Sequence, residues 1–389
     1  MFGLRVFFVT CVGLGVATAE AGPRTEDLRL ERLWVVDSEE LLIGTVEQIR
    51  VRSDRVYMLD GWLGKVLVLS SDGRILDRFG QTGEGPGEYR YPCNLLLLRD
   101  NRLGVVDRSP PKVAVLSPGG SPIEDLELGP NSEQVWDARS AGDTIVVRTV
   151  ERFYSAEKHD MVHRLRRCAI GTVEGVTYVE KTMPLPPRGE MIVHETLPAG
   201  RWVLGYNGHV YVSPSYEQYY IQVFASDGSE LKPITRVYNH VELSKSEYEQ
   251  RKKQYSDAGR RIGHYEEPSR YYRDIEAMFS LVDRTLWVQP SDGRPDPEQG
   301  VLGTFDVFDD KQSYTRRVRV FAPYDPEEDQ YFIAADRLFV VERGLDAKRA
   351  MFPGSRIEDA PNVDSEDLVA LRIVCYALPL GRVEKQETH

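Results

Sequence analysis

The sequence has few cysteines, and they lie far apart. Of four cysteines in 389 residues, Cys11 falls in an apolar N-terminal run, which leaves Cys93, Cys168 and Cys375 in the rest of the chain. An odd number of widely spaced cysteines without a CxxC pair is no disulfide framework and supplies no structural zinc site. We therefore expect buried thiols, with one disulfide at most.

Positive charge is also scarce. Lys and Arg number 49 against 61 Asp and Glu, which gives a formal net charge of −12. Nucleic acids and anionic membrane surfaces need clustered Lys and Arg, so neither is an expected partner. Beyond the N-terminus no stretch approaches the roughly 18 apolar residues of a membrane helix, so we expect no membrane span.

The N-terminus, MFGLRVFFVTCVGLGVATAEAG, has the order of a secretory signal peptide. Arg5 precedes an apolar run of about a dozen residues, and small residues follow it. Lipidation of Cys11 is disfavoured because the residues before it do not form a lipobox. We expect residues 1–21 to be removed, which leaves one domain over residues 22–389 that is periplasmic or secreted.

A pattern of four short strands recurs along the chain. Residues 49–80, IRVRSDRVYMLDGWLGKVLVLSSDGRILDRFG, alternate Val-, Leu- and Ile-rich runs with Asp and Gly turns. Residues 95–128, LLLLRDNRLGVVDRSPPKVAVLSPGGSPIEDLEL, repeat it, and four fainter copies follow. The second strands of the six copies begin near Val56, Leu103, Ile145, Val210, Leu286 and Leu338.

This spacing predicts an all-β fold, a six-bladed β-propeller of four-stranded antiparallel blades. The shorter spacings match the roughly 40 to 50 residues of one blade, and the longer ones contain insertions. An all-β sandwich is the alternative, but it does not explain four-strand groups at a fixed period. The strand LRLERLWVVDS, residues 28–38, precedes the first copy, and we expect it to complete the sixth blade and close the ring.

The glycine-rich run GQTGEGPGEY, residues 80–89, raises the question of nucleotide binding. A dinucleotide loop needs GxGxxG before a helix and a P-loop needs GxxxxGK[ST], and neither pattern is present. The run links the last strand of the first copy to the first strand of the second. We expect a blade-to-blade connection in which Gly83, Gly85 and Gly87 supply positive φ angles and Pro86 stiffens the turn.

The stretch DRFGQTGEGPGEYRYPCNLLL resembles the GxxGxGPGE[FY] segment of the six-bladed, NHL-like β-propeller proteins that many bacteria export. The likeness extends to Asp60 and Asp107 at the ends of second strands, to TLWVQP with Trp287, and to a helix-bearing insertion before it. It covers most of the chain and is most specific over residues 49–128. The resemblance implies the propeller fold and export, but no particular ligand or reaction.

Motifs that would carry catalysis are incomplete. HDMVH places His159 and His163 four residues apart but lacks the HExxH pattern of zinc proteases. SAEK, residues 155–158, matches SxxK without the SDN and KTG partners, and no GxSxG occurs. The acidic loop SDGRPDPE does not have the EF-hand spacing. We expect no cofactor, no metal ligands and no catalytic residues.

The long loops are expected on one face of the propeller. Connections between first and second strands are short, whereas those between second and third strands and between blades are long. Both long classes emerge on the same face, where repeat proteins usually bind. The longest, residues 238–276, contains a helix, SKSEYEQRKKQYSDAGRR, with a cap at Ser244 or Ser246 and an end at Gly259. This helix is either a solvated strut or a lid over the channel mouth.

Aromatic and cationic residues gather in these loops. Aromatic faces with Arg donors suit a protein, peptide or carbohydrate ligand, or a small carboxylate. The expected binding residues are Trp62, Arg90, Tyr91, Arg108, Tyr216, Tyr272 and Arg273. Asp60 and Asp107 recur at one repeat position, and we expect each to accept hydrogen bonds from nearby backbone N–H groups.

Two functions are open at this point. We favour an exported ligand- or protein-binding module that acts through its loop-rich face. The alternative is a Ca²⁺- or Zn²⁺-assisted hydrolase or lyase with its site at the central channel. Such a site needs convergent Asp, Glu, Asn or His on the innermost strands. The first strands of several copies, LLLL, WVLGY and MFSLV, are apolar, which favours binding over catalysis.

Export is expected to remove the first 19 to 21 residues. Mass spectrometry of the exported protein should give a chain that begins at Glu20 or Gly22. A protein that keeps Met1, or that carries lipid on Cys11, would contradict the signal peptide.

Overall fold

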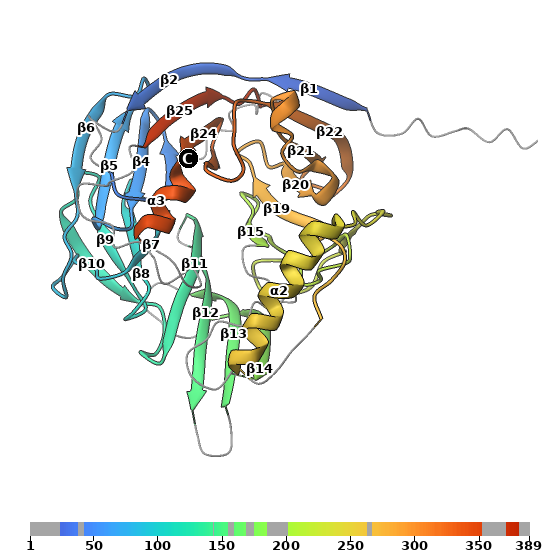
Figure 1. Cartoon of the computed structure of the whole chain (residues 1–389). Coiled ribbons are helices and arrows are strands. Elements are labelled where there is room, and N and C mark those ends of the chain that lie inside the picture. The colour runs from blue at the N-terminus through green and yellow to red at the C-terminus, as the bar shows by residue number, and fades with distance from the viewer. Residues whose placement is uncertain are drawn as a thin grey trace, which may run out of the picture.

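Four-stranded antiparallel sheets recur six times along the chain and stand as blades around a central axis (Figure 1). The computed structural model describes residues 24–37, 43–142, 144–154, 159–168, 175–184, 201–262, 267–351 and 371–380. The expected signal segment lies outside these residues.

The strands of the blades follow chain order, except that the N-terminal β2 completes blade six. They are, for blade one, β3 (Val46–Arg52), β4 (Arg55–Asp60), β5 (Lys65–Ser70) and β6 (Ile75–Phe79); for blade two, β7 (Pro92–Leu97), β8 (Leu103–Asp107), β9 (Lys112–Leu116) and β10 (Pro122–Glu127); for blade three, β11 (Glu133–Ala141), β12 (Thr144–Tyr154), β13 (His159–Cys168) and β14 (Thr177–Pro184); for blade four, β15 (Trp202–Leu204), β16 (Val210–Val212), β17 (Tyr220–Phe224) and β18 (Ile234–Thr235); for blade five, β19 (Ile275–Ser280), β20 (Leu286–Pro290), β21 (Val301–Phe308) and β22 (Tyr314–Phe321); and for blade six, β23 (Gln330–Ala334), β24 (Arg337–Glu342), β25 (Arg372–Ala377) and β2 (Glu31–Asp37). The predicted six-bladed propeller is confirmed, and each second strand begins within one residue of its predicted start.

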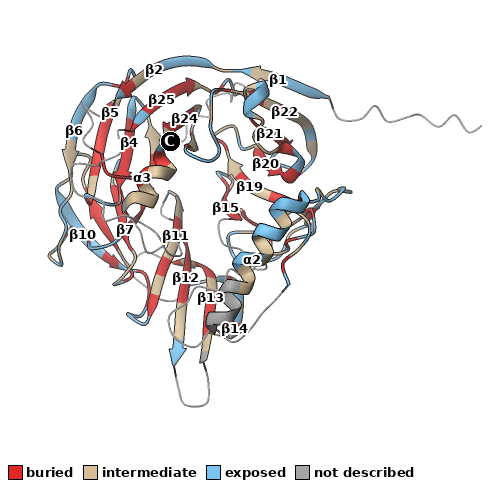
Figure 2. Cartoon of the chain, in the orientation of Figure 1, coloured by how far each residue is buried: buried red, intermediate tan, exposed pale blue. Residues whose placement is uncertain are grey.

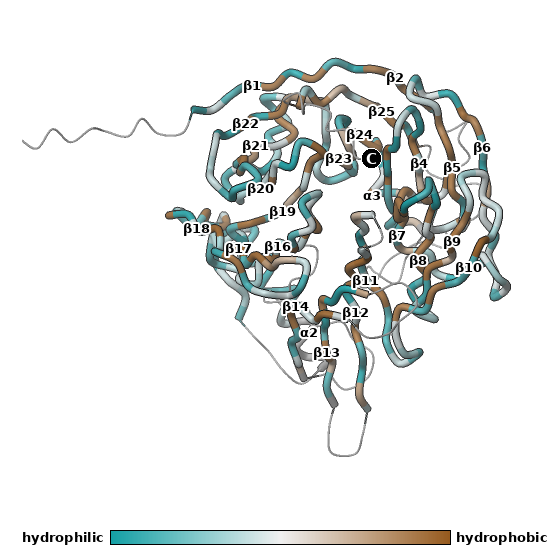
Figure 3. The backbone as a smooth tube through the Cα atoms, turned by 180° about the vertical axis from the view of Figure 1, so that it is seen from behind, coloured by the Kyte–Doolittle hydropathy of each residue, from teal (hydrophilic) through white to brown (hydrophobic). Residues whose placement is uncertain are grey.

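The first strand of each blade lies innermost. Neighbouring first strands contact one another from β23 through β3, β7, β11 and β15 to β19, and Figures 1 and 3 show them around the centre of the ring. The second and third strands are buried on both faces because each sheet is covered by the two neighbouring blades (Figure 2). Strands covered on both faces are continuously apolar, which explains runs such as KVLVLS.

The N-terminal segment closes the ring, as the sequence predicts. β2 pairs antiparallel with β25 as the outer strand of blade six. Trp34 of β2 is 8% exposed and belongs to the apolar cluster between blades six and one, where its ring lies 5.9 Å from that of Phe339. The Trp34 indole N–H donates to the Ser71 carbonyl of blade one at 2.9 Å, and Arg337 donates to the same oxygen at 2.7 Å. The closing strand is therefore held by both blades that it joins.

A further strand precedes β2 and was not predicted. β1 (Thr25–Arg29) pairs parallel with β22, so blade five has five strands. The Arg319 guanidinium donates to both carboxylate oxygens of Asp27 at 2.9 Å, and the Arg29 guanidinium lies 4.3 Å from the centre of the Phe321 ring. β1 and β2 run along the outside of blades five and six (Figure 1), and we call residues 25–37 the N-terminal strap.

The glycine-rich run is a blade-to-blade connection, between β6 and β7. Gly87 has φ 75°, as predicted, but the prediction of positive φ is wrong for Gly83 and Gly85. Both instead lie against the Glu88 side chain, whose carboxylate accepts the Gly85 N–H at 2.8 Å, and a Cβ on Gly83 would collide with that carboxylate. At these two positions glycine makes room for the Glu88 side chain rather than providing a special backbone conformation.

The two described helices lie among the long loops. Because strands alternate in direction, the loops between second and third strands and the blade-to-blade connections emerge together, and we call this the loop-rich face. α2 (Lys245–Ile262) lies in the connection between blades four and five, and α3 (Gly344–Met351) lies between β24 and β25. In Figure 1, α2 crosses in front of blade four, beside the centre of the ring. Neither described helix has the length and apolar character needed to cross a membrane.

The start of α2 matches the sequence prediction and its end does not. The Ser244 hydroxyl accepts the Glu247 N–H at 3.2 Å, and the Glu247 carboxylate accepts the Ser244 N–H at 2.9 Å, which is a capping box. The helix continues through Gly259 to Ile262, so the predicted end at Gly259 is wrong. A glycine inside a helix costs only about 1 kcal/mol, which neighbouring turns can offset.

The strap is expected to limit the stability of the whole ring. Trp34→Ala should lower the free energy of unfolding by about 3 to 5 kcal/mol, because it empties a buried site between two blades and removes an indole hydrogen bond. Leu33→Ala, next along the same strand but 42% exposed, should change it by less than about 1 kcal/mol. Urea denaturation measures both, and equal effects of the two substitutions would contradict closure by β2.

Candidate functional site

The innermost strands begin at the loop-rich face, and four of them begin with a β-bulge. One extra residue interrupts the pairing at Glu47 in β3, Cys93 in β7, Trp136 in β11 and Glu276 in β19. A bulge turns its side chain away from the regular alternation, and such residues are common at the rims of closed sheets and beside active sites. The four bulges therefore mark the inner rim of the loop-rich face as the candidate site.

Two aspartates fix the backbone around this rim. Asp107, at the end of β8, accepts the N–H groups of Arg90 and Tyr91 at 2.9 and 2.8 Å. Asp60, at the same position in β4, accepts four backbone N–H groups, from Gly44 at 2.8 Å and from residues 45, 62 and 63 at 3.0 to 3.3 Å. Burial raises the pKa of Asp60, and these four hydrogen bonds oppose the rise. The predicted role of both aspartates as backbone acceptors is confirmed.

The predicted residues Arg90, Tyr91 and Arg108 lie together around Asp107. The Arg108 N–H donates to the Tyr91 carbonyl at 3.0 Å. Tyr91 is 61% exposed, and the exposed Arg90 forms an ion pair with Glu84. We call Arg90, Tyr91 and Arg108 the first rim group. Their backbones are fixed while two of the three side chains remain accessible.

The first rim group continues into the channel through the bulged Trp136. The Arg108 and Arg148 guanidinium groups lie 5.2 and 5.6 Å from the Trp136 ring, within the roughly 6 Å of a cation–π contact. Burial lowers the pKa of Arg148, and the nearby Asp137 opposes this change. Trp136 and Arg148 were not predicted, because they lie on strands β11 and β12 and the binding residues were sought in the loops.

The predicted residues Tyr216, Tyr272 and Arg273 lie together on the opposite part of the ring, against α2. Arg251 of α2 donates to the Tyr216 hydroxyl at 2.8 Å and to the Tyr271 carbonyl at 3.0 Å. The Arg273 guanidinium lies 5.5 Å from the centre of the Tyr216 ring. Tyr216 and Tyr272 are buried, so their rings support neighbouring guanidinium groups rather than offering a free face.

Two further arginines complete this second cluster. Arg294, which follows η1 (Ser291–Gly293), lies 3.2 Å from the centre of the Tyr272 ring. Arg201 is 1% exposed and donates to the Ser215 carbonyl at 2.6 Å, and burial lowers its pKa to about 10. We call Arg201, Arg251, Arg273 and Arg294 the arginine cluster, and its members come from three separate connections and loops.

Glu276, the bulged residue of β19, lies where the arginine cluster converges. Its carboxylate is 3.9 Å from the Arg273 Nε. Burial raises the pKa of Glu276, and the charges of all four cluster arginines oppose the rise. A second carboxylate, Glu247, accepts the Tyr272 hydroxyl hydrogen and the Ser244 N–H, and these hydrogen bonds lower its pKa to about 2.

The innermost strands also carry polar residues, outside the apolar segments LLLL, WVLGY and MFSLV. Gln48 and Arg50 of β3 bind the backbone of Leu95 in the next blade at 2.6 and 3.1 Å. Asn94 of β7 donates to the Asp137 carboxylate of β11 at 3.0 Å. These polar side chains link the first strands of neighbouring blades.

The hydrolase alternative would need a metal site, and the lid hypothesis would need α2 to cover the channel. Within the described ranges, no three His, Cys, Asp or Glu side chains gather as a metal site would require. The tip of the β12–β13 hairpin, which contains SAEK, lies outside the described residues. α2 lies beside the channel rather than across it (Figure 1), and its Arg251 contacts Tyr216 and Tyr271.

Trp62 lies apart from both clusters. It is 49% exposed in the β4–β5 loop, where its side chain covers Gly44 so closely that a Cβ there would stand 2.9 Å from the indole. Its backbone N–H donates to Asp60 at 3.0 Å. The seven predicted residues therefore fall into two groups and one separate tryptophan on the same face.

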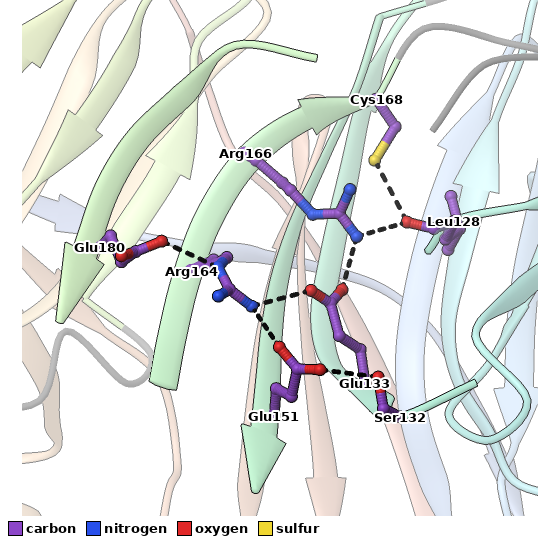
Figure 4. A network of polar contacts seen from close by, with 8 residues as sticks. All are labelled: Leu128, Ser132, Glu133, Glu151, Arg164, Arg166, Cys168 and Glu180. Atoms are coloured by element: carbon purple, nitrogen blue, oxygen red, sulfur yellow. Dashed lines mark hydrogen bonds and ion pairs between the residues drawn. The ribbon is translucent and has the colours of Figure 1, made fainter. Parts of the chain in front are cut away.

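Figure 4 shows an ion-pair network of a different kind, within blade three. Arg164 contacts Glu133, Glu151 and Glu180 at 3.0, 2.8 and 2.8 Å, and Arg166 contacts Glu133 at 2.5 Å. These residues join all four strands of the blade. Three carboxylates surround two guanidinium groups, so every arginine charge is paired at close range and the network serves the scaffold.

Comparison with known proteins agrees with the fold. Residues 29–129 match a family model described as a 6-bladed beta-propeller. No match was found among curated protein sequences.

Several solved structures are similar over most of the chain. A protein of Bacteroides fragilis is 14% identical, with a TM-score of 0.49 over 91% of this chain and 99% of that one. Regucalcin, a calcium-binding protein of Agrobacterium tumefaciens, is 12% identical, with a TM-score of 0.41 over 92% and 99%. Virginiamycin B lyase of Staphylococcus aureus is 9% identical, with a TM-score of 0.40 over 89% and 98%. At these identities and TM-scores the similarities say nothing of ligand or reaction.

Asp107 is expected to stabilise the folded protein by fixing the backbone of the rim. Asp107→Ala removes a fully buried carboxylate and leaves two partly buried N–H groups without their charged acceptor, so the free energy of unfolding should fall by about 3 kcal/mol. Asp54→Ala, in the exposed β3–β4 turn, should change it by less than about 0.5 kcal/mol. Thermal and urea denaturation measure the difference. An Asp107→Ala protein with unchanged stability would show that other contacts hold the connection between β6 and β7.

Proposed function

We propose that this protein is an exported binding module that acts through its loop-rich face. Export rests on the N-terminal sequence, in which one basic residue, an apolar run and small residues follow in the order of a signal peptide. The binding role rests on the chemistry gathered at the inner rim.

One observation carries the binding role: guanidinium groups and aromatic rings converge on the inner rim of one face. Four of six innermost strands carry bulges at that rim, and three of the bulged side chains contact charged or aromatic partners from the loops. Glu47, for example, binds Lys348 of α3 at 2.9 Å. Side chains with fixed backbones and accessible donors are what a pre-formed binding site requires.

The surrounding scaffold supports a rigid site. Asp107 fixes the backbone of Arg90 and Tyr91, and Arg251 ties α2 to Tyr216. A rim whose groups are already ordered loses little conformational entropy when a ligand binds. Accordingly, ligand affinity should depend on exposed rim side chains that contribute little to folding.

The first rim group provides the test. Arg90→Ala with Tyr91→Ala should leave the unfolding free energy within about 0.5 kcal/mol, because both side chains are exposed and the Arg90–Glu84 ion pair is at the surface. A thermal-shift screen with sugars, dipeptides and small carboxylates should identify compounds that raise the Tm by mass action. For at least one of them, the double substitution should abolish the rise.

Arg74→Ala is the control, since Arg74 is also an exposed arginine in a surface ion pair but lies in the β5–β6 turn on the opposite face. It should leave every ligand-induced rise intact. Unfolding of the Arg90, Tyr91 double variant would assign these residues to the scaffold and overturn the proposal. Stoichiometric calcium or zinc in the purified protein, together with turnover of a lactone or ester, would replace it with the hydrolase alternative.

A further inference from the structure

The arginine cluster brings four positively charged side chains close to one another. The charges of all four act on Glu276, and Glu247 is a carboxylate that contacts Tyr272, one of the cluster's aromatic supports. This concentration of positive charge stands in a protein whose formal net charge is −12. Packing alone gives no reason to bring four like charges together, because each adds to the repulsion on the others.

The ion-pair network of blade three shows how this protein matches arginines that serve the scaffold. There Arg164 and Arg166 meet three carboxylates at 2.5 to 3.0 Å (Figure 4). In the arginine cluster the ion pair between Arg273 and Glu276 is 3.9 Å long, beyond the distance of a charge-assisted hydrogen bond. The two sites therefore differ in how closely the charges pair.

Two of the four arginines are fixed by the protein backbone. Arg251 donates to the Tyr216 hydroxyl and the Tyr271 carbonyl, and Arg201 donates to the Ser215 carbonyl. The buried Arg201, and Arg251 of α2, thus contribute positive electrostatic potential from fixed positions. A cationic group at low local dielectric strengthens the binding of an anion near it.

The other two arginines each lie beside an aromatic ring. The Arg294 guanidinium carbon is 3.2 Å from the centre of the Tyr272 ring, and its buried Nε makes no hydrogen bond within the described ranges. The Arg273 guanidinium carbon is 5.5 Å from the centre of the Tyr216 ring, and its side chain is 36% exposed. The planar fork of a guanidinium suits bidentate binding of an oxyanion, and contact with a ring restricts its movement.

We propose that Arg273 and Arg294 bind the oxyanion group of a small molecule, a carboxylate or a phosphate, at the channel side of β19. Arg201 and Arg251 hold the potential that favours it, and Tyr216 and Tyr272 fix the two binding guanidinium groups. The inference rests on the proposed binding function of the loop-rich face and names the ligand chemistry of one part of that face.

Isothermal titration calorimetry at constant ionic strength tests this with three probes: citrate, inorganic phosphate and glucose. Citrate or phosphate should bind, and glucose should not. Binding of citrate alone identifies a carboxylate ligand, and binding of phosphate alone identifies a phosphate ligand. Failure of both anions at millimolar concentration would overturn the inference.

Arg273→Ala and Arg294→Ala should each raise the Kd of the binding anion about tenfold or more, because each removes a charge-assisted contact. Arg273→Lys keeps the charge but not the planar fork, so it should also weaken binding, though less than alanine does. Arg74→Ala should leave the Kd within about twofold. The thermal unfolding midpoint of each unliganded variant shows whether it folds, and the lysine variant provides a folded test if an alanine variant does not.

The outcomes separate this inference from the proposed function. One outcome is that the Tm rise of a screened compound requires Arg90 and Tyr91 while the Kd of the anion is unchanged by Arg273→Ala and Arg294→Ala. That result would support the binding module and overturn the oxyanion site. If anion binding is equally weakened by Arg74→Ala, the effect is one of overall charge, and the oxyanion site is overturned.

Discussion

The structure depends on closing the ring between blades six and one. Each blade is apolar on both faces, so every sheet needs a neighbour on each side, and an open arc would expose two such faces. β2 completes blade six, and its Trp34 packs into the same apolar cluster as Ile49 and Leu69 of blade one. Because Trp34 and Arg337 also share the Ser71 carbonyl, closure combines apolar burial with directional hydrogen bonds. The position of every rim residue follows from this closed geometry.

Closing the ring leaves backbone N–H and C=O groups on the inner edges of the blades that need hydrogen-bond partners. The side chains that provide these partners belong to the same strands as the candidate site. The first strand of a blade has a neighbour within its own sheet on one side only, so backbone groups on its other side need partners. Gln48, Arg50 and Arg52 supply them to the next blade. Towards the loop-rich face the bulges interrupt the regular pairing, and side chains such as Glu276 turn to the rim instead. Scaffold and candidate site are thus successive parts of the same six strands.

Much of the fold could be predicted from the sequence, because apolar runs, Asp and Gly turns and a regular period each report on local structure. The parallel pairing of β1 could not, since its residues are mostly exposed and lack an alternating pattern. Tyr216, Tyr272 and Arg273 were predicted as aromatic or cationic loop residues, but their convergence with Arg251 and Arg294 depends on contacts between distant loops. The bulges are one-residue shifts that a strand pattern alone does not reveal.

The N-terminal strap also has a consequence for the order in which the molecule is assembled. Asp27 and Arg319 meet across 292 positions of the chain, and β2 cannot pair until β25, almost at the other end, has formed. Contacts of such long sequence separation form late, because a long loop must close before they contribute. The residues that would emerge first from a translocation pore would therefore wait longest for their partners. During that interval the faces of blades six and one would be uncovered, which makes the nearly complete ring the stage most exposed to aggregation.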